Sequence, residues 1–239
     1  MRNTVAIAGK ELRSYFASPI AYVVITVFLV VTGLFFYYGL HDFPYEATVR
    51  HYLAPFYFQL LVVMLASVLT MRLIAEEQKT GTIELLLTAP VRDLEVVMGK
   101  FLSALAILVV MLAITLYYPL LMYWFGSPDS GPIFSAYLGA LLMGAAFVAL
   151  GVFSSTLSAN QIVAAVVSIG VLSLLLLFDW IGEEVGGDAG GVLGYLAFPN
   201  HYEDFYRGII DTEHLIYFLS FIAVSLFLAT RSLETRRWR

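Results

Sequence analysis

Residues 20–38 read IAYVVITVFLVVTGLFFYY, a run in which no side chain carries a charge. Because a helix rises about 1.5 Å per residue, such a run is long enough to cross the roughly 30 Å hydrocarbon core of a bilayer. The run lies too far inside the chain for a secretory signal peptide, and no small-residue cleavage site follows it. The stretch therefore predicts a membrane-spanning helix.

Similar apolar runs recur along the rest of the chain, at about 53–74, 101–125, 133–157, 161–180 and 214–230. Of the 239 residues, 60% are hydrophobic and 13% are charged, whereas soluble domains carry about 45–50% apolar and about 25% charged residues. Hydrocarbon offers the backbone no hydrogen-bond partners, so these spans must be helical. We predict an all-α, polytopic membrane protein with six transmembrane helices and no domain that folds in water.

The basic residues are sorted by side of the membrane. With six spans, both ends of the chain lie on one side, together with the second-to-third and fourth-to-fifth connections. Arg50 and Arg207 lie on the other side, with most of the acidic residues. The positive-inside rule therefore predicts that both termini are cytoplasmic. The cytoplasmic side would hold 11 of the 13 Lys and Arg residues: Arg2, Lys10, Arg13, Arg72, Lys79, Arg92, Lys100, Arg231, Arg236, Arg237 and Arg239.

Two segments are expected to lie along the membrane rather than across it. Residues 1–18 form an expected amphipathic interfacial helix, and residues 19–239 form the transmembrane domain. One face of that helix carries apolar side chains (Val5, Ala8, Leu12, Tyr15 and Phe16); the alternative is a basic tail with accidental periodicity. The outer connection, about 181–213, opens with a flexible glycine-rich stretch at 186–191. Its apolar part at 192–199 predicts a re-entrant or interfacial helix, with a packed loop as the alternative.

The sequence contains no motif typical of catalysis, ATP binding or metal binding. The ATP-binding loop pattern ends in Gly-Lys-Ser/Thr, but Gly9-Lys10 is followed by Glu11 and Gly99-Lys100 by Phe101. No His-Glu-x-x-His pair exists, and all four histidines fall in or beside outer connections. We therefore expect no enzyme, no ATP site and no metal site in this chain.

The spans contain essentially no ionisable residues, which disfavours an ion-coupled carrier. Their polar side chains are uncharged (Thr26, Thr32, Gln59, Ser67, Thr70, Thr115, Ser168 and Ser173), and hydrogen bonds between helices are favoured over a substrate track. Ala136, Ala140, Gly144 and Gly151 form a ridge of small residues that lets helices approach closely, more often within one chain than between chains.

The cytoplasmic connection at 75–98 is the informative one. Gly81 or Thr82 can cap a short helix, Glu84 suits its first turn, and Pro90 marks its end. Its four large apolar residues, Ile83, Leu85, Leu86 and Leu87, are expected to dock against something. They dock either onto the membrane helices of this chain or into a groove on a separate protein.

The stretch 76–91, EEQKTGTIELLLTAPV, resembles the signature of ABC-2 type transporter permeases. Three other stretches resemble the gliding-motility-associated branch of that family: SPIAY at 18–22, STLSANQIVA at 155–164 and RGIIDTEHLIYFLS at 207–220. The resemblance covers essentially the whole chain.

The resemblance implies a permease subunit in the bacterial inner membrane that couples ATP hydrolysis by a separate cytoplasmic ATPase to export or conformational work. ATP and Mg²⁺ would bind to the ATPase, and no cofactor would bind to this chain. A second permease chain, identical or not, would pair with it; a periplasmic or membrane sister subunit is possible and nucleic acid is not expected. Segment 80–90 would be the coupling helix. The implied coupling residues are Glu76, Glu77, Gly81, Thr82, Ile83, Glu84, Leu85, Leu86, Leu87 and Pro90.

A rival function belongs to another class, a structural subunit of an envelope machine that transmits force and moves no substrate. Its activity would depend mainly on the outer connection. A transporter would instead need a path of small or polar residues between two permease chains. A self-contained secondary carrier ranks third, because the spans lack charges.

Overall fold

The computed structural model describes residues 2–42, 48–83 and 91–237, with side chains described up to residue 235. Every regular element within these residues is a helix, and six helical segments are long and apolar enough to cross a membrane. They confirm the predicted all-α fold with six spans. The segments are Pro19–Asp42, Phe56–Thr80, Asp93–Phe125, Ser130–Leu157, Gln161–Val185 and Thr212–Thr235.

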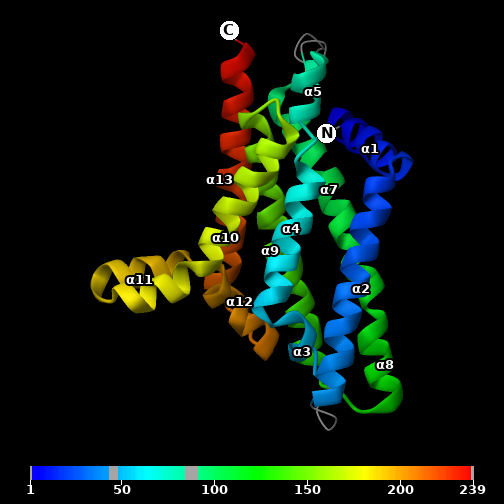
Figure 1. Cartoon of the computed structure of the whole chain (residues 1–239), viewed down its shortest axis with the longest axis vertical. Coiled ribbons are helices and arrows are strands. Elements are labelled where there is room, and N and C mark those ends of the chain that lie inside the picture. The colour runs from blue at the N-terminus through cyan, green and yellow to red at the C-terminus, as the bar shows by residue number, and fades with distance from the viewer. Residues whose placement is uncertain (1, 43–47, 84–90, 238–239) are drawn as a thin grey trace.

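The spans run alternately in opposite directions, so the two ends of the chain lie at the same end of the bundle (Figure 1). We call this the terminal end and the opposite one the distal end. Helix α5 (Ala75–Thr80) lies at the terminal end, whereas α3 (Arg50–Leu53) and α12 (Phe198–Arg207) lie at the distal end. Arg50 and Arg207 are thus separated from the other Lys and Arg residues that the structure describes, as the sequence predicts.

The third span begins before its apolar run. Helix α7 (Asp93–Thr115) starts at Asp93 rather than at about residue 101, and α8 (Tyr117–Phe125) completes the span. Asp93 and Glu95 lie in its first turn, where carboxylates complement the positive end of the helix dipole. The Glu95 carboxylate also accepts a hydrogen bond from the backbone N–H of Arg92 at 3.2 Å. Lys100 consequently lies within a helix and not in a connection.

Helix α9 (Ser130–Leu157) occupies the middle of the bundle. It packs against α4 (Phe56–Thr70), α7, α10 (Gln161–Val185), α12 and α13 (Thr212–Arg237). Its ridge of small residues is buried against these neighbours: a Cβ on Gly144 would lie 2.6 Å from the Leu108 side chain, and a Cβ on Gly151 would overlap the Thr70 side chain. The expectation that the ridge packs within the chain is therefore confirmed.

Uncharged polar side chains join the spans, as predicted. Ser67 of α4 donates a hydrogen bond to Ser168 of α10 at 2.9 Å. Tyr137 of α9 donates to the backbone carbonyl of Thr115 in α7, also at 2.9 Å. Because lipid cannot satisfy these groups, such bonds favour one arrangement of the helices.

Helix α1 (Arg2–Ala17) packs across α7 at the terminal end and leads into α2 (Pro19–Asp42). The predicted apolar face divides in two. Ala8 and Tyr15 are buried in the protein, whereas Val5 and Phe16 are exposed on its surface. The packed face also includes Ile7, whose side chain lies over Gly99 of α7 and leaves no room there for a Cβ.

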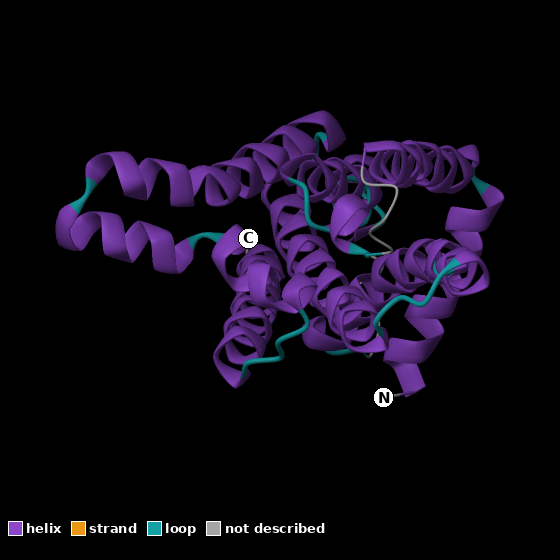
Figure 2. Cartoon of the chain, turned by 90° about the horizontal axis from the view of Figure 1, so that it is seen from below, coloured by secondary structure: helices purple, strands orange, loops and turns teal. Residues whose placement is uncertain are grey.

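The glycine-rich stretch at 186–191 is not a flexible linker, which corrects the expectation. Gly186 and Gly187 adopt left-handed backbone angles that turn the chain, and α11 (Gly187–Leu196) follows at once. Glycine is needed because α10 and α11 touch backbone to backbone: a Cβ on Gly182 would lie 2.8 Å from the carbonyl oxygen of Gly190. The end of α10 and the whole of α11 lie side by side and reach sideways from the bundle (Figures 1 and 2). Residues 192–196 are therefore helical, and the alternative of a packed loop does not apply to them.

Candidate functional site at the terminal end

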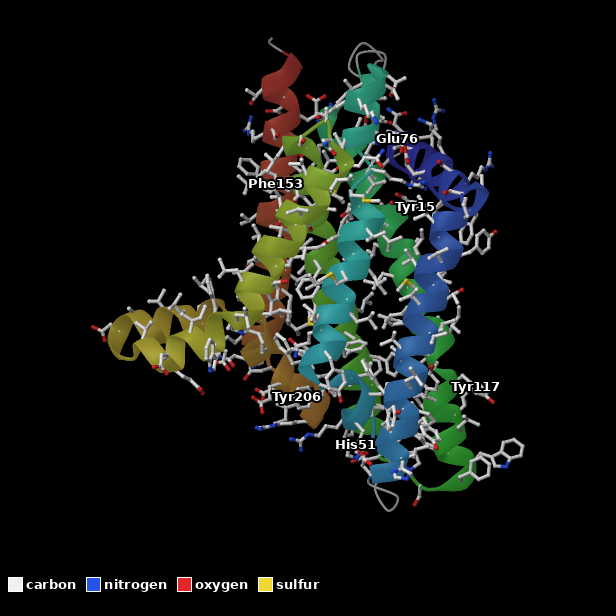
Figure 3. All side chains as sticks on the ribbon, in the orientation of Figure 1. Tyr15, His51, Glu76, Tyr117, Phe153 and Tyr206 are labelled. Atoms are coloured by element: carbon white, nitrogen blue, oxygen red, sulfur yellow. The ribbon has the colours of Figure 1, made fainter. Side chains whose placement is uncertain are left out.

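Helix α5 and the turn before it form the described part of the connection between the second and third spans. The chain leaves α4 at Thr70, turns through residues 71–74 and continues as α5. Gly81 ends α5 in a left-handed conformation, with a φ of 72° that favours glycine. Gly81 therefore terminates α5. Figure 3 shows Glu76 on this helix at the terminal end.

A buried lysine joins α5 to two other helices. The Nζ atom of Lys100, two turns into α7, lies 2.9 Å from a carboxylate oxygen of Glu77 in α5. It lies 3.2 Å from a carboxylate oxygen of Glu11 in α1, and it also donates to the backbone carbonyl of Leu73. The Lys100 side chain is 1% exposed, against 14% for Glu11 and 16% for Glu77.

We call Glu11, Glu77 and Lys100 the charge cluster. Its two carboxylates share one buried cation, and Lys10 adds a weaker contact to Glu77 at 4.0 Å from the surface. A buried charge that loses its partner costs about 3–5 kcal/mol, because its desolvation is then uncompensated. The cluster therefore fixes α1, α5 and α7 relative to one another more firmly than exposed ion pairs would.

Helix α9 holds the same connection from the other side. The hydroxyl oxygen of Ser155 accepts hydrogen bonds from the backbone N–H groups of Ile74 and Ala75, each at 3.0 Å. The same hydroxyl donates to the carbonyl of Met71 at 3.2 Å. Gln78 adds a bond from its amide to the carbonyl of Thr156 at 3.1 Å. One serine thus satisfies three backbone groups of the turn, which hydrocarbon cannot solvate.

Tyr15 anchors α1 to the end of α4 in the same region (Figure 3). Its hydroxyl donates to the backbone carbonyl of Leu69, and the guanidinium of Arg72 lies 4.5 Å from the centre of its ring. Burial raises the pKa of Tyr15, so the hydroxyl stays a hydrogen-bond donor. Asn3 extends the attachment by donating to the Glu95 carboxylate of α7 at 3.1 Å.

The structure separates the coupling residues expected from the sequence. Glu76 and Thr82 are exposed, and Glu77 belongs to the charge cluster. Ile83 is partly buried and packs against the core of its own chain. The remaining candidates, Glu84, Leu85, Leu86, Leu87 and Pro90, lie outside the residues that the structure describes.

Sequence reasoning missed Glu11, Lys100 and Ser155. Lys100 counted only as a basic residue flanking a span, since its partners lie 89 positions earlier and 23 positions earlier in the chain. A lysine inside an extended helical pattern was the available signal, because an ionisable residue at membrane depth needs a partner.

A model of the ABC-2 family transporter proteins matches residues 5–237 of the chain. The chain belongs to this family. It is accordingly a multi-pass membrane protein and the permease component of an ABC transporter. The match spans all six membrane-spanning helices and the charge cluster. It identifies the family and does not identify the gliding-motility-associated branch within it. A comparison with curated proteins found no match.

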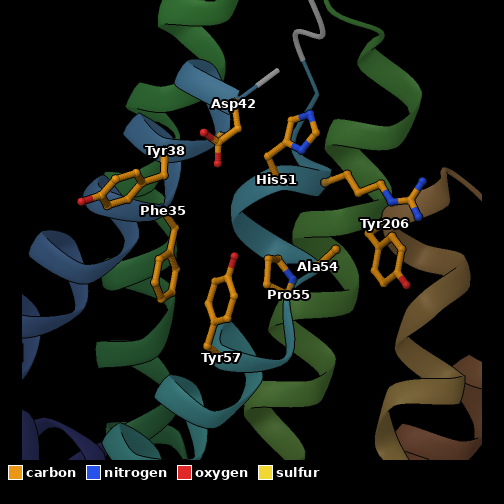
Figure 4. A pocket seen from close by; sticks show the side chains of 10 residues that line it. Phe35, Tyr38, Asp42, His51, Ala54, Pro55, Tyr57 and Tyr206 are labelled. Carbon is orange, nitrogen blue, oxygen red and sulfur yellow. The ribbon is translucent and has the colours of Figure 1, made fainter. Parts of the chain in front are cut away.

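The distal end of the permease contains a pocket. A pocket of about 520 Å³ lies between α2, the region of α3 and α12, and Tyr206 of α12 forms one wall (Figure 4). Phe35 and Tyr57 pack together in it with ring centres 4.3 Å apart, and Arg50 lies 5.7 Å from the centre of the Tyr206 ring. The whole bundle separates this pocket from the charge cluster, so the two sites are distinct.

Among the described residues, no group of His, Asp and Glu is arranged to hold a metal ion.

Proposed function

We propose that this permease receives conformational work from a separate ATPase through the connection at residues 75–98. The observation that carries the proposal is the attachment of α5 to three helices at once. Lys100 ties α5 to α7 and α1, and Ser155 ties the turn before α5 to α9. A force on the chain after Gly81 would therefore move several helices together instead of being absorbed in a loop.

The proposed mechanism places ATP and Mg²⁺ on two copies of the ATPase, each bound to one permease chain of a pair. Closure of the ATPases on ATP displaces the segment 80–90 of each chain. The buried contacts of α5 pass that displacement to α1, α7 and α9. A change in the angle between the two permease chains then opens or closes a path between them.

Individual roles follow for the coupling residues. Leu85, Leu86 and Leu87 supply the apolar contact to the ATPase, with Glu84 at the start of the docked helix and Pro90 at its end, while Ile83 packs against its own chain. Thr82 and Glu76, which are exposed, face the ATPase. Glu77 orients α5 from within the permease, since its carboxylate pairs with Lys100.

The proposal sets the orientation in the membrane. The ATPase is cytoplasmic, so the terminal end of the bundle and both termini face the cytoplasm of a bacterial cell, and the distal end faces outward. The concentration of Lys and Arg at the terminal end supports this orientation.

Purification of the permease from its native membrane in a mild detergent tests the proposal. The expected result is a stoichiometric co-purifying protein with ATP-binding motifs, and further subunits would indicate whether cargo or force is the output. A permease that is recovered intact and binds no ATPase at any detergent concentration that preserves its fold would overturn the proposal.

A further inference from the structure

Three backbone carbonyls at the end of α11 accept hydrogen bonds from side chains of the next two helices. Gly194 accepts from the Asn200 amide at 2.9 Å, and Leu196 accepts from the Tyr217 hydroxyl at 2.9 Å. The carbonyl of Tyr195, between them, contacts Nε2 of His201 at 2.7 Å. A carbonyl oxygen can only accept, so His201 carries a proton on Nε2.

His201 and His214 touch through their Nδ1 atoms, which lie 2.8 Å apart. On its other side, His214 places Nε2 at 2.9 Å from a carboxylate oxygen of Asp204. His201 and Asp204 belong to α12 and His214 to the first turn of α13, so the contacts join these helices across the linker 208–211.

The three contacts need three protons, which is one proton more than two neutral imidazoles and an ionised carboxylate carry. The contacts from Tyr195 to His201, from His201 to His214 and from His214 to Asp204 each need one proton. Two neutral imidazoles carry only two. The third proton sits on an imidazole as a charge paired with Asp204, or on Asp204 itself, and either way it belongs to the group as a whole.

The surroundings decide where that proton resides. His201 is 3% exposed, and burial lowers its pKa, which disfavours a charge on this ring. The ring of Tyr217 stacks on it with centres 3.7 Å apart. Nε2 of His214 lies against the Asp204 carboxylate, which is 32% exposed, so the third proton belongs to the contact between these two groups rather than to the buried His201 ring.

The other charged groups around the site are accounted for. Glu213 of α13 adds a negative charge that favours protonation of His201. Glu203 pairs with Arg207 on the surface of α12, and Asp179 of α10 accepts from Asn200 at 2.7 Å. Tyr195 contributes the edge of its ring from α11. Helix α9, which packs against α12, contains no charged residue.

We propose that Asp204, His214 and His201 form a binding site for a single proton at the distal end, and that its occupancy locks α12, α13 and the end of α11 together. Loss of the proton leaves one of the three contacts without a hydrogen: the contact between the two Nδ1 atoms, the contact to Tyr195, or the contact between His214 and Asp204. Each of these losses loosens α11 and the adjoining end of α10, which reach sideways from the bundle. The site thus makes the distal end respond to pH, independently of the proposed coupling to an ATPase.

Nitrogen NMR of ring-¹⁵N-labelled histidine in the full-length permease tests proton sharing. The chain has four histidines, so His41→Asn and His51→Asn variants assign the signals. The signals of His201 and His214 should change together in one transition. Asp204→Asn should shift the transition of His201, which Asp204 does not touch, whereas Glu203→Gln should leave it unchanged. Independent transitions of the two histidines would overturn the proposal.

Hydrogen exchange tests the locking. At one fixed pH, exchange in residues 187–198 should be several-fold faster in Asp204→Asn than in Glu203→Gln, while exchange in α4 and α9 is equal in both. Equal exchange in residues 187–198 would contradict the lock. If Asp204→Asn fails to fold, the wild-type pH titration decides, since a single joint transition with faster exchange above it is still required.

Discussion

The Nζ atom of Lys100 lies 2.9 Å from a carboxylate oxygen of Glu77, and the two residues stand on helices separated by the segment expected to bind an ATPase. Lys100 begins the path into the membrane along α7, and Glu77 lies one turn before Gly81, where α5 ends. The pair is a buried ion pair that holds together the two helices on either side of residues 81–92.

Glu77→Gln should lower the free energy of unfolding by about 1–3 kcal/mol, because a charged hydrogen bond to a buried lysine becomes a neutral one. Glu76→Gln is the matched control, since Glu76 is the neighbouring residue and is exposed. Its effect should stay within about 0.5 kcal/mol. Denaturation in mixed micelles measures both, and equal effects would mean that the pair does not hold α5.

Ser155→Ala should destabilise the turn before α5 by about 1–3 kcal/mol, because two buried backbone N–H groups lose the hydroxyl that accepts their hydrogen bonds. Exchange of the amides of Ile74 and Ala75 should become faster. Ser154→Ala, one position earlier on the same helix, removes the same atom without touching the turn. The outcome against this prediction is unchanged amide exchange in Ser155→Ala.

Gly139→Ala should destabilise the permease by about 1–3 kcal/mol, because the new methyl group would lie 2.5 Å from the Cβ of Phe205 and force α9 from α12. Gly170→Ala is the control: it also lies mid-helix, but nothing lies within 4 Å of the added atom. Relief of the glycine entropy cost should stabilise that variant by roughly 0.5–1 kcal/mol. Thermal unfolding in detergent compares the two, and the same sign for both would contradict the packing argument.

Leu86→Asp should abolish association with the ATPase while leaving membrane insertion intact, since a carboxylate cannot enter an apolar groove without a large desolvation cost. Leu86→Met, which keeps the site apolar, should retain association. Co-purification measures both variants. An Asp variant that retains wild-type association would show that Leu86 is not part of the docking face.

The spans could be predicted from the sequence because each one satisfies its own backbone and needs only an apolar run. The start of α7 could not be predicted, because residues 93–100 contain three charged residues, which is typical of a connection between spans. The buried charge of Lys100 is tolerated in the helix only through partners elsewhere in the chain, such as Glu11 on α1. Long-range pairing of this kind leaves no local pattern.

The same limit explains the distal end. His201 and His214 are 13 positions apart on different helices, and their contact depends on the turn at Gly208, whose φ is 94°. The glycine-rich stretch at 186–191 differs from its predicted structure for a related reason. Composition reads glycine as flexible, whereas here the lack of side chains allows Gly182 and Gly190 to touch.

Site-specific photo-crosslinking tests the central claim most directly. A photoreactive residue is placed at Thr82, which is exposed at the terminal end, and for comparison at Thr212, which is exposed at the distal end. After irradiation of native membranes, Thr82 should give a crosslink to a protein with ATP-binding motifs, and Thr212 should give none. An ATP-binding protein captured only from Thr212, or captured from neither position, would contradict the account.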